Sequence, residues 1–309
     1  MASGNAVTDE GVAPRPAGIL TGIGLTAAGY AIFSVQDATV KWLAATYAVP
    51  QILFLRSLVI VVIALALGGR GGVGALARSR NKSPILLRAG LITLAWLLYY
   101  SASRYLGLAE MTTLYFAAPV IAVALAALIL KERVDASRWF AVLLGFAGVV
   151  VAAAPSHTMN PIPSLAVLAA ACCWAASAIL VRRIGRSDST VTQMLAANLL
   201  SCIACLPALP SAWATPDAFG LALMLGLGVI GGVGQYLLYE GFRFAPASVV
   251  APIEYSGLVW AFLYGYAIWG DRPALRVYLG AALIAASSLT LVGFERRRHR
   301  RALRENVRP

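Results

Sequence analysis

This sequence has ionisable side chains within otherwise apolar stretches. Asp37 is the first of them that could bind a ligand. On the helix expected around it, Ser34, Asp37 and Lys41 share one face, because they follow i, i+3 and i+7 spacing. At 1.5 Å per residue, Asp37 lies about 29 Å along that helix from Gly18. An internal ion pair between Asp37 and Lys41, shared with Arg56, is one interpretation. The other is a charged pair that grips the ammonium and carboxylate groups of a zwitterion.

A second acid, Glu254, follows the start of another apolar stretch, and Tyr255 is next to it. About eight residues of helix would place Glu254 roughly 12 Å from the start of that stretch. A buried carboxyl group of this kind can bind and release a proton during a functional cycle. Packing against a polar neighbour is the alternative.

Aromatic and hydroxyl-bearing side chains recur at helical spacing in several apolar stretches. Trp96, Tyr99 and Tyr100 form a stripe that offers an indole N–H and two phenol hydroxyls. A glycine-rich run leads to Gln235 and Tyr239, which share a helix face. Such stripes line a ligand cavity or simply pack in a core, and both interpretations stay open. The candidate binding residues are Ser34, Asp37, Lys41, Trp96, Tyr99, Tyr100, Tyr115, Trp174, Ser177, Gln235, Tyr239, Glu254 and Tyr255.

Catalytic and metal-binding constellations do not occur in the apolar stretches of the sequence. The two histidines, His157 and His299, lie outside them, and the chain contains no HExxH zinc motif. Two cysteine pairs, at 172–173 and at 202 and 205, are interpreted as small packing residues rather than a redox or metal pair. We therefore expect no catalytic residues, no metal and no cofactor, and the sequence argues against an enzyme.

Long apolar stretches carry all of these candidates. Of the 309 residues, 60% are hydrophobic and 12% are charged, and the mean hydropathy of +0.78 is typical of a membrane protein. A helix needs about 20 apolar residues to cross the hydrocarbon core. Continuous runs of this length predict an all-α membrane protein with ten transmembrane helices. The expected spans are 18–44, 50–68, 84–103, 108–130, 137–154, 164–181, 190–209, 218–239, 247–269 and 274–294.

Positive charge is distributed unevenly between the loops. The formal net charge is +12, and most of the 25 lysine and arginine residues fall in the two tails and in alternate loops. By the positive-inside rule, this distribution predicts that both termini are cytoplasmic. The arginine-rich end of the chain is explained by contact with anionic lipid head groups, so we expect the lipid bilayer as its partner and no nucleic acid.

An internal repeat relates the two halves of the chain. At an offset of 142, residues 50–58 align with 192–200, and at an offset of 139, residues 129–133 align with 268–272. Each half then has five spans, and because five is odd, the second half enters the membrane from the opposite side. The expected segments are an N-terminal tail at 1–17, a first repeat at 18–154, a linker at 155–163, a second repeat at 164–294 and a basic C-terminal tail at 295–309.

Short motifs mark the fourth and the ninth spans. Residues 118–121 read Ala-Pro-Val-Ile, and Glu132 follows Pro119 by thirteen residues at the end of the span. In the second half, Leu258 and Asp271 stand where the proline and the glutamate would be. On these motifs and on its plan of ten spans in two halves, the sequence resembles the EamA-type branch of the drug/metabolite transporter superfamily.

The resemblance implies a multi-pass secondary transporter of the bacterial inner membrane. It also implies a cavity lined chiefly by the first, third, fourth, sixth, eighth and ninth helices, and alternating access between the halves. We expect export of small metabolites, above all amino acids, with aromatic or other hydrophobic ones favoured. Export of a different metabolite or a drug by proton antiport is the alternative. A membrane-embedded enzyme or a sensor is less favoured, because the sequence offers neither a catalytic constellation nor a soluble signalling segment.

Overall fold

Helices make up nearly all of the described chain. The computed structural model describes residues 16–79, 82–118, 121–122, 124–125, 136–153, 161–184, 188–244 and 256–305, and no strand occurs among them. The elements are α1 (Pro16–Ala44), α2 (Val49–Arg78), α3 (Lys82–Ala102), α4 (Leu108–Tyr115), α6 (Ala136–Ala153), α7 (Pro161–Ile184), α8 (Thr190–Cys205), η1 (Leu206–Ala208), α9 (Leu209–Ala212), α10 (Ala218–Phe244), α12 (Ser256–Trp269) and α13 (Leu275–Glu305).

Each predicted span contains one of these helices, and the all-α membrane fold is confirmed, although several ends differ. α13 continues to Glu305 through the basic segment that we expected as a tail, because arginine, alanine and leucine favour helix. α7 begins at Pro161, inside the expected linker, since proline is tolerated in the first turn of a helix. α8 ends at Cys205, before the end of its predicted span, because Pro207 lacks the N–H that would continue the helix.

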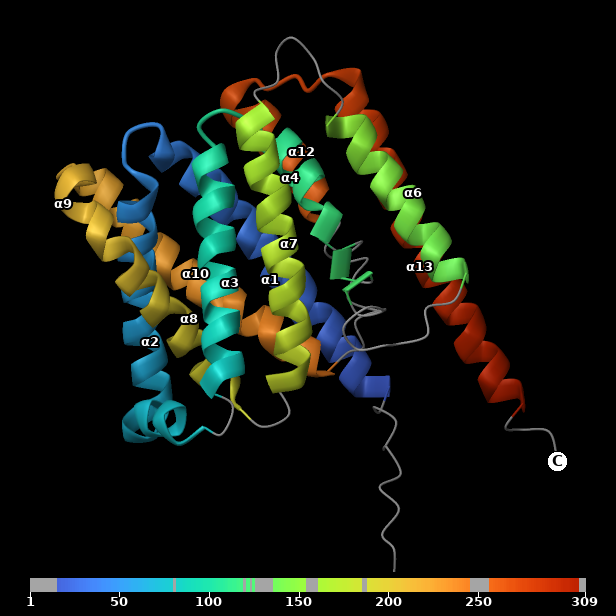
Figure 1. Cartoon of the computed structure of the whole chain (residues 1–309), viewed down its shortest axis with the longest axis horizontal. Helices are drawn as coiled ribbons and strands as arrows, with labels where there is room; N and C mark the ends of the chain where they lie inside the picture. The colour runs from blue at the N-terminus through green and yellow to red at the C-terminus, as the bar shows by residue number, and fades with distance from the viewer. Residues whose placement is uncertain are drawn as a thin grey trace, which may run out of the picture.

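The helices of the two halves pack as a two-fold repeat requires (Figure 1). α1 packs against α10, and at the equivalent place α7 packs against α3. α2 packs against α8, its own counterpart in the other half, and α6 packs against its counterpart α13. In Figure 1 the α6 and α13 pair forms one edge of the molecule, and α2, α8 and α9 lie at the other.

The α6–α13 contact shows how the two halves are oriented. A Cβ added at Gly148 would meet Ile284, and one added at Gly280 would meet Ala152, so the two helices run antiparallel. The backbones are in close contact, since a Cβ at Gly148 would lie 2.7 Å from the carbonyl oxygen of Gly280. Antiparallel pairing of equivalent helices is what a two-fold axis in the membrane plane produces. The repeats are therefore inverted.

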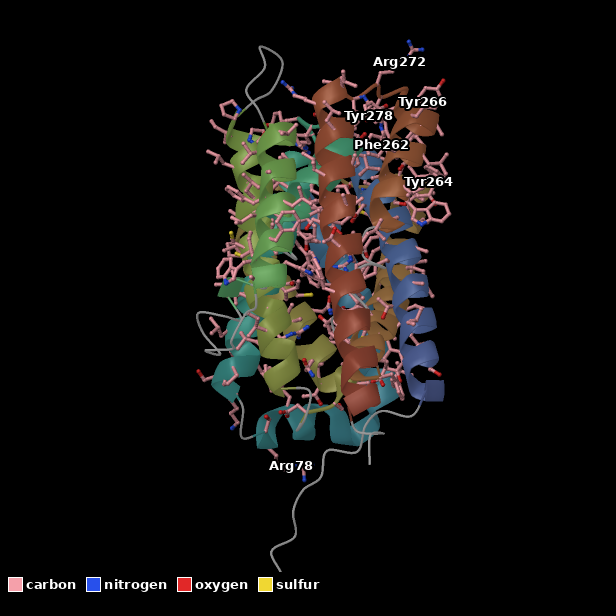
Figure 2. All side chains as sticks on the ribbon, turned by 90° about the vertical axis from the view of Figure 1, so that its right-hand side faces the viewer. Arg78, Phe262, Tyr264, Tyr266, Arg272 and Tyr278 are labelled. Carbon is pink, nitrogen blue, oxygen red and sulfur yellow. The ribbon has the colours of Figure 1, made fainter. Side chains whose placement is uncertain are left out.

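The outer surface of the helix bundle is apolar. Large hydrophobic side chains such as Val62 and Leu67 are exposed. Within the part of the chain that the structure describes, five helices have the length and composition to cross a membrane, namely α2, α3, α7, α8 with its short extension, and α10. Figure 2 shows Tyr266 and Arg272 at one end of the bundle and Arg78 at the other, as expected for residues at membrane interfaces. These features are those of a multi-pass membrane protein.

Candidate binding cavity

A cavity lies between helices of both halves. α1 and α3 supply most of its wall, while α4, α7 and α12 complete it. Because α7 and α12 belong to the second half, the cavity occupies the junction at which an inverted-repeat fold holds its site. The lining residues are Tyr30, Phe33, Ser34, Gln36, Asp37, Ala95, Trp96, Tyr99, Tyr100, Leu108, Thr112, Tyr115, Phe116, Trp174, Gly257 and Ala261.

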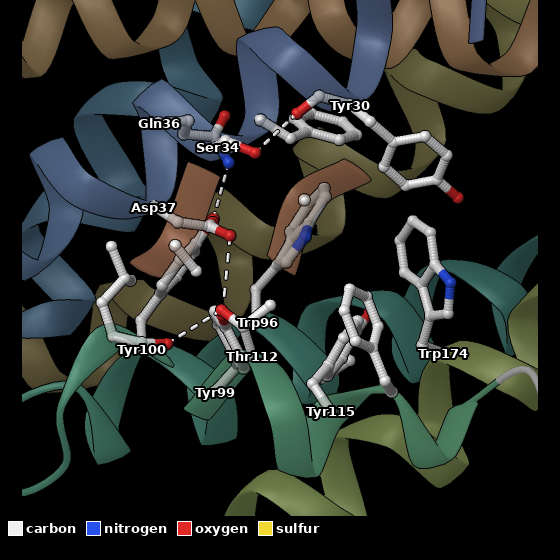
Figure 3. Close-up of a pocket in the computed structure, with 16 residues that line it drawn as sticks. Tyr30, Ser34, Gln36, Asp37, Trp96, Tyr99, Tyr100, Thr112, Tyr115 and Trp174 are labelled. Carbon is white, nitrogen blue, oxygen red and sulfur yellow. Dashed lines mark hydrogen bonds between the residues drawn. The ribbon is translucent and has the colours of Figure 1, made fainter. Parts of the chain in front are cut away.

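Polar groups gather around Asp37 at one end of the cavity (Figure 3). The Tyr100 hydroxyl donates to Asp37 Oδ1 at 3.3 Å, and the Tyr99 hydroxyl donates to Oδ2 at 3.5 Å. The hydroxyls of Tyr99 and Thr112 also share a contact of 3.4 Å. These distances are long for hydrogen bonds between oxygen atoms. The carboxylate therefore keeps the capacity to accept stronger hydrogen bonds from a ligand, and a cationic group is the partner it favours.

Aromatic rings form the opposite end of the cavity. The ring centroids of Tyr99 and Tyr115 are 5.0 Å apart, and those of Tyr115 and Trp174 are 6.2 Å apart. Figure 3 shows Tyr30 and Trp174 together on the side away from Asp37. A cavity with one polar and one aromatic end fits an amphipathic molecule with a flat or hydrophobic body.

A buried arginine stands behind the polar end. Arg56 on α2 is 0% exposed, and its Nε donates to Gln36 Oε1 at 3.1 Å. Gln36 donates in turn from Nε2 to the Tyr100 hydroxyl at 2.6 Å. The guanidinium of Arg56 also lies 4.4 Å from the centroid of the Trp96 ring. Three hydrogen bonds thus connect Arg56, through Gln36 and Tyr100, to Asp37.

Lys41 lies one helical turn beyond Asp37 but contacts other partners. Its Nζ donates to the Leu106 carbonyl at 2.7 Å and lies 3.9 Å from Asp271 Oδ2. It also lies 5.3 Å from the centroid of the Trp269 ring. Lys41 is thus ion-paired with Asp271 rather than with Asp37, because the end of α12 brings that carboxylate to the end of α1. It does not line the cavity, and its role in gripping a substrate stays a prediction.

The predicted residues on α10 belong to a separate buried cluster. Gln235 accepts from Asn198 Nδ2 at 3.0 Å and donates to the Tyr239 hydroxyl at 2.8 Å. The Arg88 guanidinium lies 4.5 Å from the centroid of the Tyr239 ring. Neither Gln235 nor Tyr239 lines the cavity, and Ser177 on α7 is buried without lining it either. The single ring of residues expected around one site is therefore divided between two clusters.

The cavity brings together seven of the predicted residues: Ser34, Asp37, Trp96, Tyr99, Tyr100, Tyr115 and Trp174. Glu254 and Tyr255 lie outside the described residues. Sequence reasoning missed Tyr30 and Phe33, although both follow helical spacing to Asp37 and the pattern could have found them. Gln36 gave no such signal, because its role depends on Arg56 from another helix.

Comparisons with known proteins agree with this architecture. The model of the EamA-like transporter family matches residues 20–154 and again residues 162–293. The riboflavin transporter of Vibrio cholerae is 31% identical over 208 residues, which cover 67% of this chain and 68% of that protein. The pseudopaline exporter CntI of Pseudomonas aeruginosa is 27% identical over 267 residues, with 84% and 91% covered. The S-adenosylmethionine uptake transporter of Rickettsia felis is 27% identical over 285 residues, with 90% and 94% covered.

A solved crystal structure is also similar to this chain. The superposition has a TM-score of 0.64 and covers 92% of this chain and 99% of the other. The two sequences are 21% identical, so this likeness concerns the fold alone.

Proposed function

Because the chain belongs to the EamA-like transporter family, whose model matches it twice, we propose that it exports a small amphipathic metabolite through the cavity at Asp37. The family and the named relatives are membrane transporters, so the chain is a transporter of small molecules and not an enzyme. Amino acids with aromatic or other hydrophobic side chains are the proposed substrates. The bacterial inner membrane, with both termini in the cytoplasm, is the proposed location.

One observation carries the choice of substrate: among the described lining residues, one carboxylate, that of Asp37, marks the polar end of the cavity, and aromatic rings mark the other end. The ammonium group of an amino acid would bind Asp37 with a charge-assisted hydrogen bond. Its side chain would lie against Tyr115 and Trp174, where burial of a large apolar group contributes about 2 kcal/mol. Rocking of the inverted halves would then open the cavity to each side of the membrane in turn.

A second candidate is export of another small metabolite, or of a drug, in exchange for protons. The relatives favour a substrate other than an amino acid, because their names give three different small molecules, carried by an exporter in one case and an uptake transporter in another. Among the lining residues that the structure describes, Asp37 is the carboxylate that would carry the proton in this case.

Flux into liposomes that contain the purified protein tests both candidates. Labelled Phe, Trp, Met and Thr are compared with riboflavin and S-adenosylmethionine, with and without an imposed pH gradient. We expect uptake of Phe or Trp above that of empty liposomes, and an Asp37→Asn variant should lose about tenfold or more of it. Glu305→Gln changes the acid at the last residue of α13, a helix that does not line the cavity, and is the matched control that should keep wild-type flux. Flux of riboflavin or S-adenosylmethionine alone would favour the second candidate, and no flux of any compound would overturn both.

A further inference from the structure

Arg56 carries a buried positive charge, and a glycine of α10 leaves space for its side chain. It is 0% exposed, and its two terminal guanidinium nitrogens have no hydrogen-bond partner among the described residues. Gly231 on α10 faces it, since a Cβ at that position would lie 3.0 Å from Arg56 Nε. A buried cation is costly unless a negative charge lies within reach. The position of Arg56 therefore calls for a compensating group nearby.

Asp37 is that group, on the other side of the cavity wall. Gln36 and Tyr100 join the two charges by hydrogen bonds of 3.1, 2.6 and 3.3 Å, and both also line the cavity. Trp96, which lines the cavity as well, separates the guanidinium from the open space. Arg56 thus stands one side chain behind the wall and is not among the residues that line the cavity.

We propose that Arg56 is a specificity-determining residue that makes the cavity select substrates without net charge. With Asp37 alone, a cavity of low dielectric constant would attract cations most strongly. The positive charge of Arg56 opposes a second positive charge and attracts a negative one. A zwitterion satisfies both, with its ammonium at Asp37 and its carboxylate toward the wall formed by Gln36 and Trp96. The inference rests on the proposed function, because both place the ligand at Asp37.

Three ligands that share one aromatic body test this selection. Phenethylamine is a cation, phenylalanine a zwitterion and 3-phenylpropionate an anion at pH 7. Their binding to the purified full-length protein is measured by titration calorimetry. Wild type should bind phenylalanine more tightly than phenethylamine. In Arg56→Gln the ratio of the two affinities should move toward phenethylamine by about tenfold or more. This is expected for the loss of one nearby charge in surroundings of low dielectric constant. Arg56→Lys keeps the charge and should keep the wild-type order.

A matched control comes from the other buried arginine of the described chain with a stacked ring. Arg88 is 2% exposed and lies over Tyr239, away from the cavity lining, so Arg88→Gln should leave the order of the three ligands unchanged. The same order in Arg56→Gln as in wild type would overturn the inference and leave the proposed function standing. Tighter binding of phenethylamine than of phenylalanine by wild type would overturn it without any variant. Binding of none of the three ligands would overturn the proposed amino-acid substrate and the inference together.

Discussion

At Asp37 the hydrogen bonds are long, whereas the bond behind it, from Gln36 to Tyr100, is only 2.6 Å. The phenol of Tyr100 therefore has two tasks: it accepts firmly from Gln36 and donates loosely to the carboxylate. This leaves the carboxylate available to a ligand while its surroundings stay fixed. The apolar context of Asp37 makes it a candidate from sequence alone, but its partners come from other helices and only the fold brings them together.

Removal of the Tyr100 hydroxyl should therefore lower the stability of the protein more than removal of the Tyr99 hydroxyl. In Tyr100→Phe the buried Nε2 of Gln36 loses its acceptor, which is expected to lower stability by about 1–3 kcal/mol. Tyr99→Phe loses only contacts of 3.4 and 3.5 Å and serves as the control. Thermal unfolding in detergent measures both variants. Equal midpoints for Tyr100→Phe and wild type would show that the hydrogen bond from Gln36 to Tyr100 is not needed for stability.

Asp217, in the loop before α10, links stability to pH. The backbone N–H of Gly220 donates to its carboxylate at 2.8 Å and the Tyr47 hydroxyl donates at 2.9 Å, and these bonds lower the pKa of Asp217 below its ordinary value. Because the pKa of Asp217 is lower in the folded state, its ionised carboxylate stabilises the fold. This stabilisation is complete above the pKa of the unfolded chain, about 3.9, and is lost as pH falls through the lower pKa of the folded state. Unfolding followed between pH 3 and pH 6 should show a weaker dependence in Asp217→Asn. An identical dependence would contradict this role.

Among the elements, the helices with glycine at their contacts set how closely the halves approach. Gly148 of α6 and Gly280 of α13 allow backbone contact, whereas Gly226 of α10 has nothing within 4 Å of an added Cβ. Membrane helices without a hydrophobic driving force depend on such close packing. Glycine is therefore required at the α6–α13 contact, whereas at position 226 it can be replaced.

Two alanine substitutions should separate these roles. Gly148→Ala would place a Cβ 2.7 Å from the Gly280 carbonyl oxygen, so the pair must move apart and the thermal midpoint should fall. Gly226→Ala meets open space and should raise stability by up to about 1 kcal/mol through helix propensity. The midpoints of both variants in the same detergent give the comparison. A loss of stability in both, or in neither, would mean that the α6–α13 contact is not limiting.

The sequence predicts the positions of these helices better than it predicts their ends, because the two depend on different physical signals. Hydropathy gives the position of each span, because a helix of about 20 apolar residues must be continuous in sequence. The ends follow weaker local preferences, which is why α7 starts at Pro161 and α13 reaches Glu305. The division between the cavity and the cluster at Gln235 was not predictable, since helical spacing says which residues share a face but not which helix that face meets.

In the whole molecule, contacts at the C-terminal end of α1 join the two halves. Lys41 bonds the Leu106 carbonyl of the first half and pairs with Asp271 of the second. Close by in sequence, Tyr47 of the first half bonds Asp217 of the second. A rocking motion that opens the cavity on the face of the molecule where α1 ends must separate such contacts. The contacts therefore favour the state in which that face is closed.

Loss of the Lys41–Asp271 pair should shift the molecule toward the state open on that face. The pair is partly exposed, so Asp271→Asn is expected to change this equilibrium by only about two- to fivefold. An Ala261→Cys residue in the cavity wall reports it through its rate of modification by a membrane-impermeant thiol reagent. The rate should rise in the double variant relative to Ala261→Cys alone. An unchanged or slower rate would show that the pair does not hold the face closed.

Counterflow tests most directly whether the chain is a carrier with a cavity between inverted halves. Liposomes that contain the protein are loaded with excess unlabelled phenylalanine and diluted into a trace of labelled phenylalanine. A carrier that exposes its cavity to one side at a time exchanges internal for external substrate, so label should accumulate transiently above its equilibrium level and then decline. Label that rises to equilibrium without an overshoot, at a rate independent of the internal phenylalanine, would contradict alternating access.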